Sequence, residues 1–249
     1  MVKVRSAGEL DLMRKSGQIS AKALKATLNA IKPGVSLFDL EQVAEREILK
    51  YGGESSFKTV PGYHWTSCLT INDEVVHGIP RDIKLKEGDI LGIDLGAMYQ
   101  GWHTDCAWSV VVGGGGNNFL EVGEKALWAG VNQAIEGNRI GDISETIQQI
   151  VEGGGYSIVR SLVGHGIGQA LHEEPEVPGF GKKGTGLELK AGMTLAVEVI
   201  YTSGSGQVYL SDDGWTIASK DKSLGGLFEM SIIVGKEYPE VLTDWRNLT

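Results

Sequence analysis

Two aspartates stand close together in residues 92–105, on either side of a short turn. The apolar residues around Asp94 and Asp105 are typical of two strands. A hairpin symmetric about Tyr99 and Gln100 would place the two carboxylates opposite each other on one face. Two like charges in such a place need a shared proton or a cation. A register shifted by one residue would separate them, so a turn aspartate and a solvated strand aspartate remain the alternative.

Two glutamates interrupt apolar strand-like runs later in the chain. Glu198 lies within Met193–Ile200, and Glu229 lies within Leu227–Ile233. A charged glutamate in a buried strand is costly unless it is paired, protonated or bound to a metal. Exposure on an edge strand is the alternative for each residue taken alone.

Two histidines lie in a glycine-rich region. His165 is flanked by glycines in residues 164–168, and His172 follows seven residues later. A neutral imidazole can be a metal ligand, a proton carrier or a buried polar group with satisfied hydrogen bonds. Glu176 stands where a zinc-protease helix would need its second histidine, and the glycine spacing of residues 164–168 does not fit a dinucleotide fingerprint. Residues 179–185 resemble a phosphate loop but lack the lysine after its last glycine.

Taken together, four carboxylates and one imidazole form a chemically coherent set. Such hard and borderline donors suit a pair of divalent cations that share bridging carboxylates. The candidate ligands are Asp94, Asp105, His165, Glu198 and Glu229.

The elements that must position these residues follow from hydrophobic periodicity and from turn signals. Helices are expected over about residues 10–28, 37–48, 119–135 and 142–151. Strands are expected over residues 68–71, 90–97, 108–112, 157–163, 193–201, 207–210 and 227–234. Because the helices are grouped rather than alternating with strands, the pattern favours an α+β fold.

The order of two helices followed by strands occurs twice, which suggests an internal repeat. Residues 37–40 align with residues 140–143 at an offset of 103, and Glu198 lies 104 residues after Asp94. Each half would then supply a carboxylate to one central site, although amphipathic helices also resemble one another by chance. No proline- or serine-rich linker divides the halves, so one domain over residues 1–249 is expected.

Composition narrows the class of protein. The 249 residues carry a net charge of −9, which argues against binding to nucleic acid or to an anionic membrane. The two cysteines are too few for a disulfide framework. No apolar run is typical of a signal peptide or a membrane span, so a cytoplasmic protein is expected.

Several longer motifs stand out, namely residues 72–80 (NDEVVHGIP), 88–94 (GDILGID), 164–168 (GHGIG), 171–175 (LHEEP) and 181–186 (GKKGTG). These motifs are similar to those of the type I methionine aminopeptidases. The similarity extends over nearly the whole chain. It implies the pita-bread fold, with two pseudo-symmetric halves in which helices cover a curved antiparallel sheet. Only 31 residues separate Glu198 from Glu229, which leaves no room for the insertion of the type II enzymes.

The resemblance also implies roles for particular residues. Asp94 would chelate one of two divalent ions (Co, Mn, Fe or Zn), Asp105 and Glu229 would bridge both, and His165 and Glu198 would complete the second site. Glu198 would also act as the catalytic base. His172 and His77 would contact the substrate backbone at the cleaved bond. The methionine side chain would lie against residues that line a pocket, namely Tyr63, Cys68 and Trp215.

The implied activity is removal of the N-terminal methionine from nascent proteins and peptides with a small second residue, by attack of metal-activated water. The implied enzyme is a monomer that meets nascent chains, with the ribosome as one place of encounter. Three residues depart from the family pattern: Cys106, Val199 and Met230. Two alternatives stay open, a related X-Pro aminopeptidase or dipeptidase and a non-catalytic peptide-binding protein with the same fold.

Overall fold

Helices and strands follow one another in two similar blocks in the computed structural model, which describes residues 3–248. The helices are α1 (Ala7–Asn29), α2 (Leu37–Lys50), α3 (Asn118–Val131) and α4 (Ile140–Gly153), with short 3-10 turns η1 (Phe57–Thr59) and η2 (Trp245–Asn247). The strands of the first block are β1 (Glu54–Ser55), β2 (Ser67–Ile71), β3 (Glu74–Val76), β4 (Ile90–Tyr99) and β5 (Trp102–Val111). The later strands are β6 (Ser157–Ile158), β7 (Gly164–Gly166), β8 (Glu173–Val177), β9 (Thr194–Thr202), β10 (Val208–Leu210), β11 (Ile217–Ser219), β12 (Gly225–Ile233) and β13 (Glu240–Val241).

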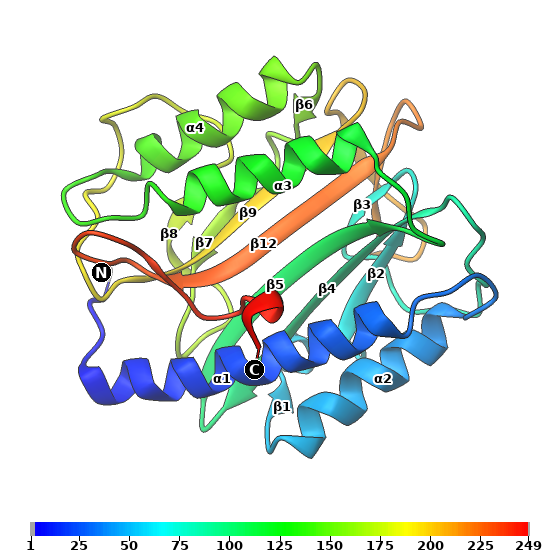
Figure 1. The fold of residues 1–249 in the computed structure, drawn as a ribbon, viewed down its shortest axis with the longest axis horizontal. Coiled ribbons are helices and arrows are strands. Elements are labelled where there is room, and N and C mark those ends of the chain that lie inside the picture. Colours follow the sequence, from blue (N-terminus) through cyan, green and yellow to red (C-terminus); the bar gives the residue numbers. More distant parts are fainter. Residues whose placement is uncertain (1–2, 249) are drawn as a thin grey trace.

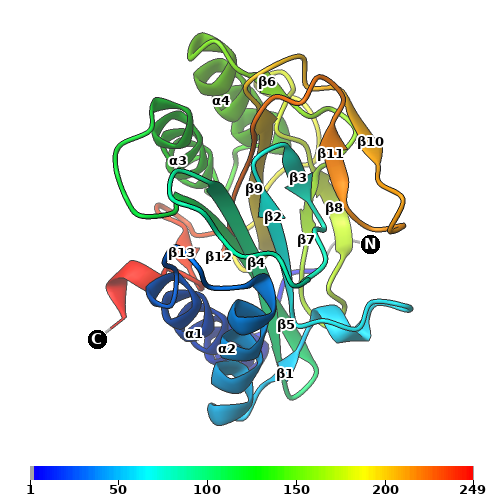
Figure 2. The ribbon, with the colours of Figure 1, turned by 90° about the vertical axis from the view of Figure 1, so that its right-hand side faces the viewer.

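One large antiparallel sheet runs through the molecule in the order β1-β4-β5-β12-β9-β7-β8. The four long helices lie together on one face of this sheet, as the side view shows (Figure 2). A small sheet of β10, β11 and β3 lies on the other side of the large sheet. The α+β class and the helix-covered sheet expected from the sequence are therefore confirmed.

The two halves of the sheet are related as the suspected repeat requires. Helices α2 and α4 are each 14 residues long and begin 103 residues apart. All four helices lie on the same face of the sheet (Figure 2). In the view of Figure 1, the α1–α2 pair lies in the lower half, beside β4 and β5, and the α3–α4 pair lies in the upper half, beside β12 and β9. Strands β5 and β12 meet in the middle, so the boundary between the halves crosses the centre of the sheet.

Local sequence explains where the helices begin. Ser36 and Asp39 form a reciprocal capping box at the start of α2, as the sequence suggested for Ser36. Helix α4 begins at Ile140, two residues earlier than expected, because the Asp142 carboxylate accepts a hydrogen bond from the Arg139 backbone N–H at 2.8 Å.

The β4–β5 hairpin differs from the expected register by two residues. Its turn consists of Gln100 and Gly101, both with positive φ (50° and 78°), so Tyr99 pairs with Trp102. Asp94 therefore pairs with Ala107 instead of Asp105. Because the shift is even, both aspartates still face the same side of the sheet.

The strands on either side of residues 159–163 also differ from expectation. The strand expected over 157–163 is only two residues long, β6, because the chain leaves the sheet after Ile158. A second strand was not predicted: the glycine-flanked His165, for which no element was expected, lies in β7, which pairs with both β8 and β9.

Candidate active site

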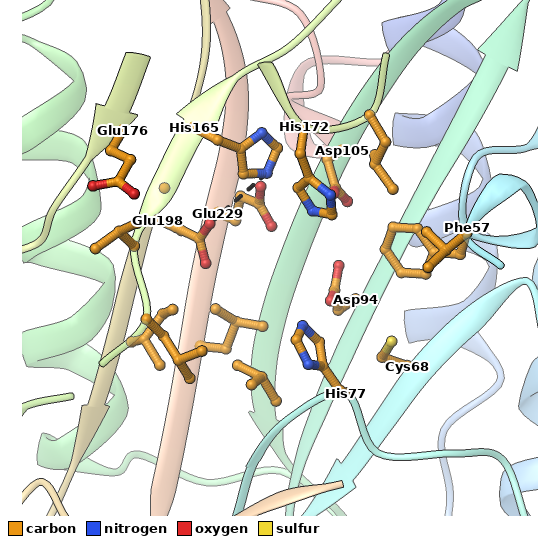
Figure 3. Close-up of a pocket in the computed structure, with 18 of the residues that line it drawn as sticks. Phe57, Cys68, His77, Asp94, Asp105, His165, His172, Glu176, Glu198 and Glu229 are labelled. Atoms are coloured by element: carbon orange, nitrogen blue, oxygen red, sulfur yellow. Dashed lines mark ion pairs between the residues drawn. The ribbon is translucent and has the colours of Figure 1, made fainter. Parts of the chain in front are cut away.

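Five strands that are neighbours in the sheet each carry one of the five candidate ligands. In the order β4, β5, β12, β9 and β7, these residues are Asp94, Asp105, Glu229, Glu198 and His165. Their side chains gather on the face that the long helices leave uncovered (Figures 2 and 3). The antiparallel topology thus brings together residues that are far apart in sequence.

Strand register places three of the carboxylates in one row. Glu229 pairs directly with Glu198 on one side and with Ala107 on the other, and Ala107 also pairs with Asp94. The small side chain of Ala107 leaves space between Asp94 and Glu229. Asp105 lies two residues from Ala107 and therefore on the same face.

The remaining candidate ligand approaches from β7. His165 pairs with Ala196, two residues before Glu198. The His165 Nε2 atom lies 3.9 Å from Glu198 Oε1. One donor atom from each of Asp105, His165 and Glu229 lies within 4.8 Å of the other two. These three residues therefore have the spacing of ligands around one cation.

Burial and mutual repulsion make the four carboxylates costly as free anions. Burial raises the pKa of Asp105 to about 7. Burial and then the neighbouring carboxylates raise the pKa values of the other three acids, Asp94, Glu198 and Glu229. In the described part of the chain, no lysine or arginine forms an ion pair with any of the four.

Unpartnered oxygens support a cation site. Asp94 Oδ1, Asp105 Oδ1 and Glu229 Oε1 are buried and have no hydrogen-bond partner among the described residues. Such orphaned acceptors are expensive, and divalent cations satisfy them. A set of carboxylate oxygens with one imidazole nitrogen fits Mn, Fe, Co or Zn.

The histidines of the site are held as neutral imidazoles. Burial, and next the adjacent His172, lower the pKa of His165 to about 4. Burial also lowers the pKa of His172, whose ring centroid lies 4.5 Å from that of His165. Neutral imidazoles suit both metal ligation and hydrogen-bond donation to a substrate.

His77 reaches the site from the end of β3. It has a positive φ of 58°, which is uncommon for a residue with a side chain. A Cβ on the next residue, Gly78, would lie 2.3 Å from the Leu69 carbonyl oxygen, so this backbone must pass very close to β2. Burial, with a smaller effect of His172, lowers the pKa of His77.

The candidate ligands face a cavity of about 570 Å³. One part of its wall is aromatic: the Tyr63 ring lies edge-on to Trp215 with centroids 5.0 Å apart. The Tyr63 hydroxyl donates to the Ser67 carbonyl oxygen at 2.8 Å and lies 3.1 Å from Cys68 Sγ. Cys68 pairs with Asp94 in the sheet, which places this aromatic wall beside the carboxylates.

All ten site residues expected from the sequence line this cavity. Sequence reasoning missed other lining residues, among them Phe57, Val76, Leu162, Ile200 and Leu227. Alternation along β9 and β12 could have identified two of them, because Ile200 and Leu227 are two residues from Glu198 and Glu229. The others had no signal, because the tertiary packing of η1, of β3 and of the loop after β6 brings them to the cavity.

The three departures from the family pattern lie away from the cavity. Cys106, Val199 and Met230 are fully buried in the core between the sheet and the helices. Met230 Sδ accepts a hydrogen bond from Thr243 Oγ1 at 3.3 Å. Cys106 pairs with Met230 across β5 and β12. The three substitutions therefore alter packing behind the site.

Fold and donor set together define a metallopeptidase. The model of metallopeptidase family M24 matches residues 11–232, and the chain belongs to this family. Metallopeptidases act with bound metal, and the buried, unpartnered carboxylates described above are suited to hold it.

Similar proteins within this family carry the name of one kind of peptidase. The chain is 39% identical over 246 residues to a methionine aminopeptidase of Clostridium perfringens, covering 98% of this chain and 99% of the relative. It is 40% identical over 246 residues to methionine aminopeptidase 1 of Bacillus subtilis, with the same coverage. The crystal structure of methionine aminopeptidase from Thermotoga maritima superposes with a TM-score of 0.95 at 36% identity, covering 98% of this chain and 99% of that one.

Other peptidases have a similar fold. Prolidase from Pyrococcus furiosus gives a TM-score of 0.78 at 21% identity, and the match covers 96% of this chain and 65% of that one. This likeness concerns the fold alone. Within residues 3–248, the helices are all too short or too polar to cross a membrane.

Proposed function

We propose that the chain removes N-terminal methionine from proteins and peptides by metal-dependent hydrolysis. The observation that carries this proposal is the group of four buried or half-buried carboxylates and one histidine facing a partly aromatic cavity (Figure 3). Relatives of nearly the same length, 39–40% identical, are named methionine aminopeptidases. The whole of residues 1–249 would form one catalytic domain.

The donor set is large enough for two divalent ions. In this proposal Asp94 would hold one ion, His165 and Glu198 would hold the other, and Asp105 and Glu229 would be shared between them. When bound, the ions supply Lewis-acid activation of water and of the peptide carbonyl. Co, Mn, Fe and Zn are all compatible with these ligands.

Side chains of the chain would move the protons and position the bond. Glu198 would accept the proton of the attacking water and pass it to the leaving amine. Neutral His172 donates a hydrogen bond to the carbonyl oxygen, where negative charge develops. His77 lies across the carboxylates from His172 in Figure 3, and it orients the substrate backbone.

Specificity for methionine would come from the aromatic wall. Tyr63, Cys68 and Trp215 offer a polarizable, apolar surface, which favours contact with a thioether. Ile200 and Leu227 face the cavity next to Glu198 and Glu229, and their bulk favours a small second residue. The substrates are nascent chains, met in the cytoplasm and at the ribosome, and the enzyme acts as a monomer.

Metal-dependent release of methionine from Met-Ala-Ser tests this proposal. Glu198→Ala and Asp105→Ala should abolish release, and so should removal of metal with a chelator. The control is Glu188→Ala, because Glu188 is an exposed acid that pairs with Arg139 on the surface. Full activity in either site variant, or in the metal-stripped protein, would contradict the proposed mechanism.

A further inference from the structure

Arg5 lies just before α1, yet it is only 7% exposed. Its backbone N–H donates to the Gly192 carbonyl oxygen at 2.9 Å, which ties the chain start to the turn before β9. Its guanidinium group lies 5.2 Å from the centre of the Trp102 ring. A buried arginine needs hydrogen bonds and an opposite charge, so its bonding partners identify the segments that it connects.

Those partners lie at both ends of the segment that joins β7 to β8. Arg5 Nη2 donates to the Ile167 carbonyl oxygen at 3.3 Å and forms an ion pair with the Glu173 carboxylate. Arg5 Nε donates to Thr194 Oγ1 at 3.3 Å, and this hydroxyl donates to the Ile167 carbonyl oxygen at 2.6 Å. One guanidinium group therefore clamps the two ends of the segment together.

The clamped segment carries His172 and directly follows β7, the strand that carries His165. Ile167 is two residues after His165, and Glu173 directly follows His172. The two imidazole rings pack edge-on, with centroids 4.5 Å apart. Arg5 joins Ile167 to Glu173, so it fixes the distance between these two residues. The relative placement of the two imidazole rings depends on that distance.

Gly168 makes the close approach possible. A Cβ at this position would lie 2.2 Å from Arg5 Nη2. The Gly168 carbonyl oxygen also accepts a hydrogen bond from the His103 backbone N–H at 2.7 Å, which fixes the segment to β5. The last glycine of the GHGIG motif, Gly168, is thus explained by its packing against Arg5.

We infer that Arg5 is a positioning residue that holds His172 and His165 in register through the Ile167 carbonyl group and Glu173. Arg5 is not among the described residues that line the cavity, so it acts through the segment that it clamps. The catalytic consequence rests on the proposed function. Loss of such an outer contact is expected to cost about 10–100-fold in activity.

The test compares kcat and KM for Met-Ala-Ser in Arg5→Gln, Arg5→Lys and Glu173→Gln. We expect Arg5→Gln and Glu173→Gln each to lower kcat about 10–100-fold with little change in KM. The double variant should be no worse than either single variant, and Arg5→Lys should be intermediate because it keeps the charge but loses the planar fork. The control is Arg14→Gln, whose ion pairs with Asp11 and Glu240 are exposed.

A second measurement does not depend on activity. Imidazole NMR resonances of the full chain with excess Zn, which is diamagnetic, should shift for His165 and His172 in Arg5→Gln. The resonances of exposed His64 should not move. A folded Arg5→Gln protein with wild-type kcat and wild-type imidazole resonances would overturn the inference. If the wild-type chain releases no methionine, the proposed function fails, and the resonances alone decide the role of Arg5.

Discussion

Glu198 and Glu229 are direct antiparallel partners on β9 and β12, so a half-buried and a fully buried carboxylate stand side by side on the same face of the sheet. Adjacent like charges of this kind destabilise a protein unless a proton or a cation compensates them. The sheet is thus built around a site that metal binding would complete.

This electrostatic cost predicts how stability depends on pH and metal. In the metal-free protein burial raises the pKa of Asp105 to about 7, whereas an unfolded aspartate titrates near about 3.9. Between these values the folded state binds more protons than the unfolded state. The free energy of unfolding therefore falls as pH rises through this window.

We accordingly expect the chelator-treated protein to have a lower Tm at pH 7.5 than at pH 5.5. Excess Mn at pH 7.5 should raise the Tm, because a ligand of the folded state stabilises it. Asp105→Asn should weaken both effects. Thermal unfolding followed by circular dichroism measures them, and a metal-free Tm that rises between pH 5.5 and 7.5 would be inconsistent with the buried carboxylate cluster.

The aromatic wall predicts a selective loss of substrate binding. Trp215→Ala removes the ring that packs against Tyr63 and exposes that side of the cavity. We expect KM for Met-Ala-Ser to rise about tenfold, from lost apolar and sulfur–aromatic contact. Steady-state kinetics measure this change. Tyr209→Ala, at an exposed aromatic on β10, is the control, and an unchanged KM in Trp215→Ala would remove Trp215 from the pocket.

The backbone at His77 predicts a contrast between two glycine variants. Gly78→Ala would place a Cβ 2.3 Å from the Leu69 carbonyl oxygen, so the backbone must shift and carry His77 with it. Gly8→Ala, in α1, meets nothing within 4 Å. We expect Gly78→Ala to lower kcat/KM at least tenfold, as misplacement of a substrate-orienting group does. Gly8→Ala should keep full activity and gain up to about 1 kcal/mol in stability. Equal activities in the two variants would show that the position of His77 does not matter.

The parts of the fold that could be predicted from sequence are those encoded locally. The Ser36 cap, the helix periodicities and the apolar strands around Glu198 and Glu229 all depend on neighbouring residues. The equivalent positions of Asp94 and Glu198 could also be predicted, because Glu198 lies 104 residues after Asp94. In the structure the two residues lie on β4 and β9, which occupy matching places on either side of β5 and β12.

Features that depend on distant partners, or on a turn residue in an unusual conformation, could not be predicted. The register of the β4–β5 hairpin was wrong because Gln100, an unusual residue for a left-handed turn position, adopts a positive φ. Strand β7 was missed because its two glycines have low strand propensity, and pairing with β8 and β9 stabilises it. The ion pair between Arg5 and Glu173 could not be predicted, because no sequence motif links two residues that lie 168 positions apart.

A competition assay tests the central claim most directly. The protein is incubated with Mn or Co and an equimolar mixture of Met-Ala-Ser, Leu-Ala-Ser and Ala-Pro-Ala, and the released amino acids are measured by mass spectrometry. We predict that methionine is released far faster than leucine or alanine, and that a chelator stops its release. Preferential cleavage of Ala-Pro-Ala, or no metal-dependent release of methionine with Mn, Co, Fe or Zn, would contradict the account.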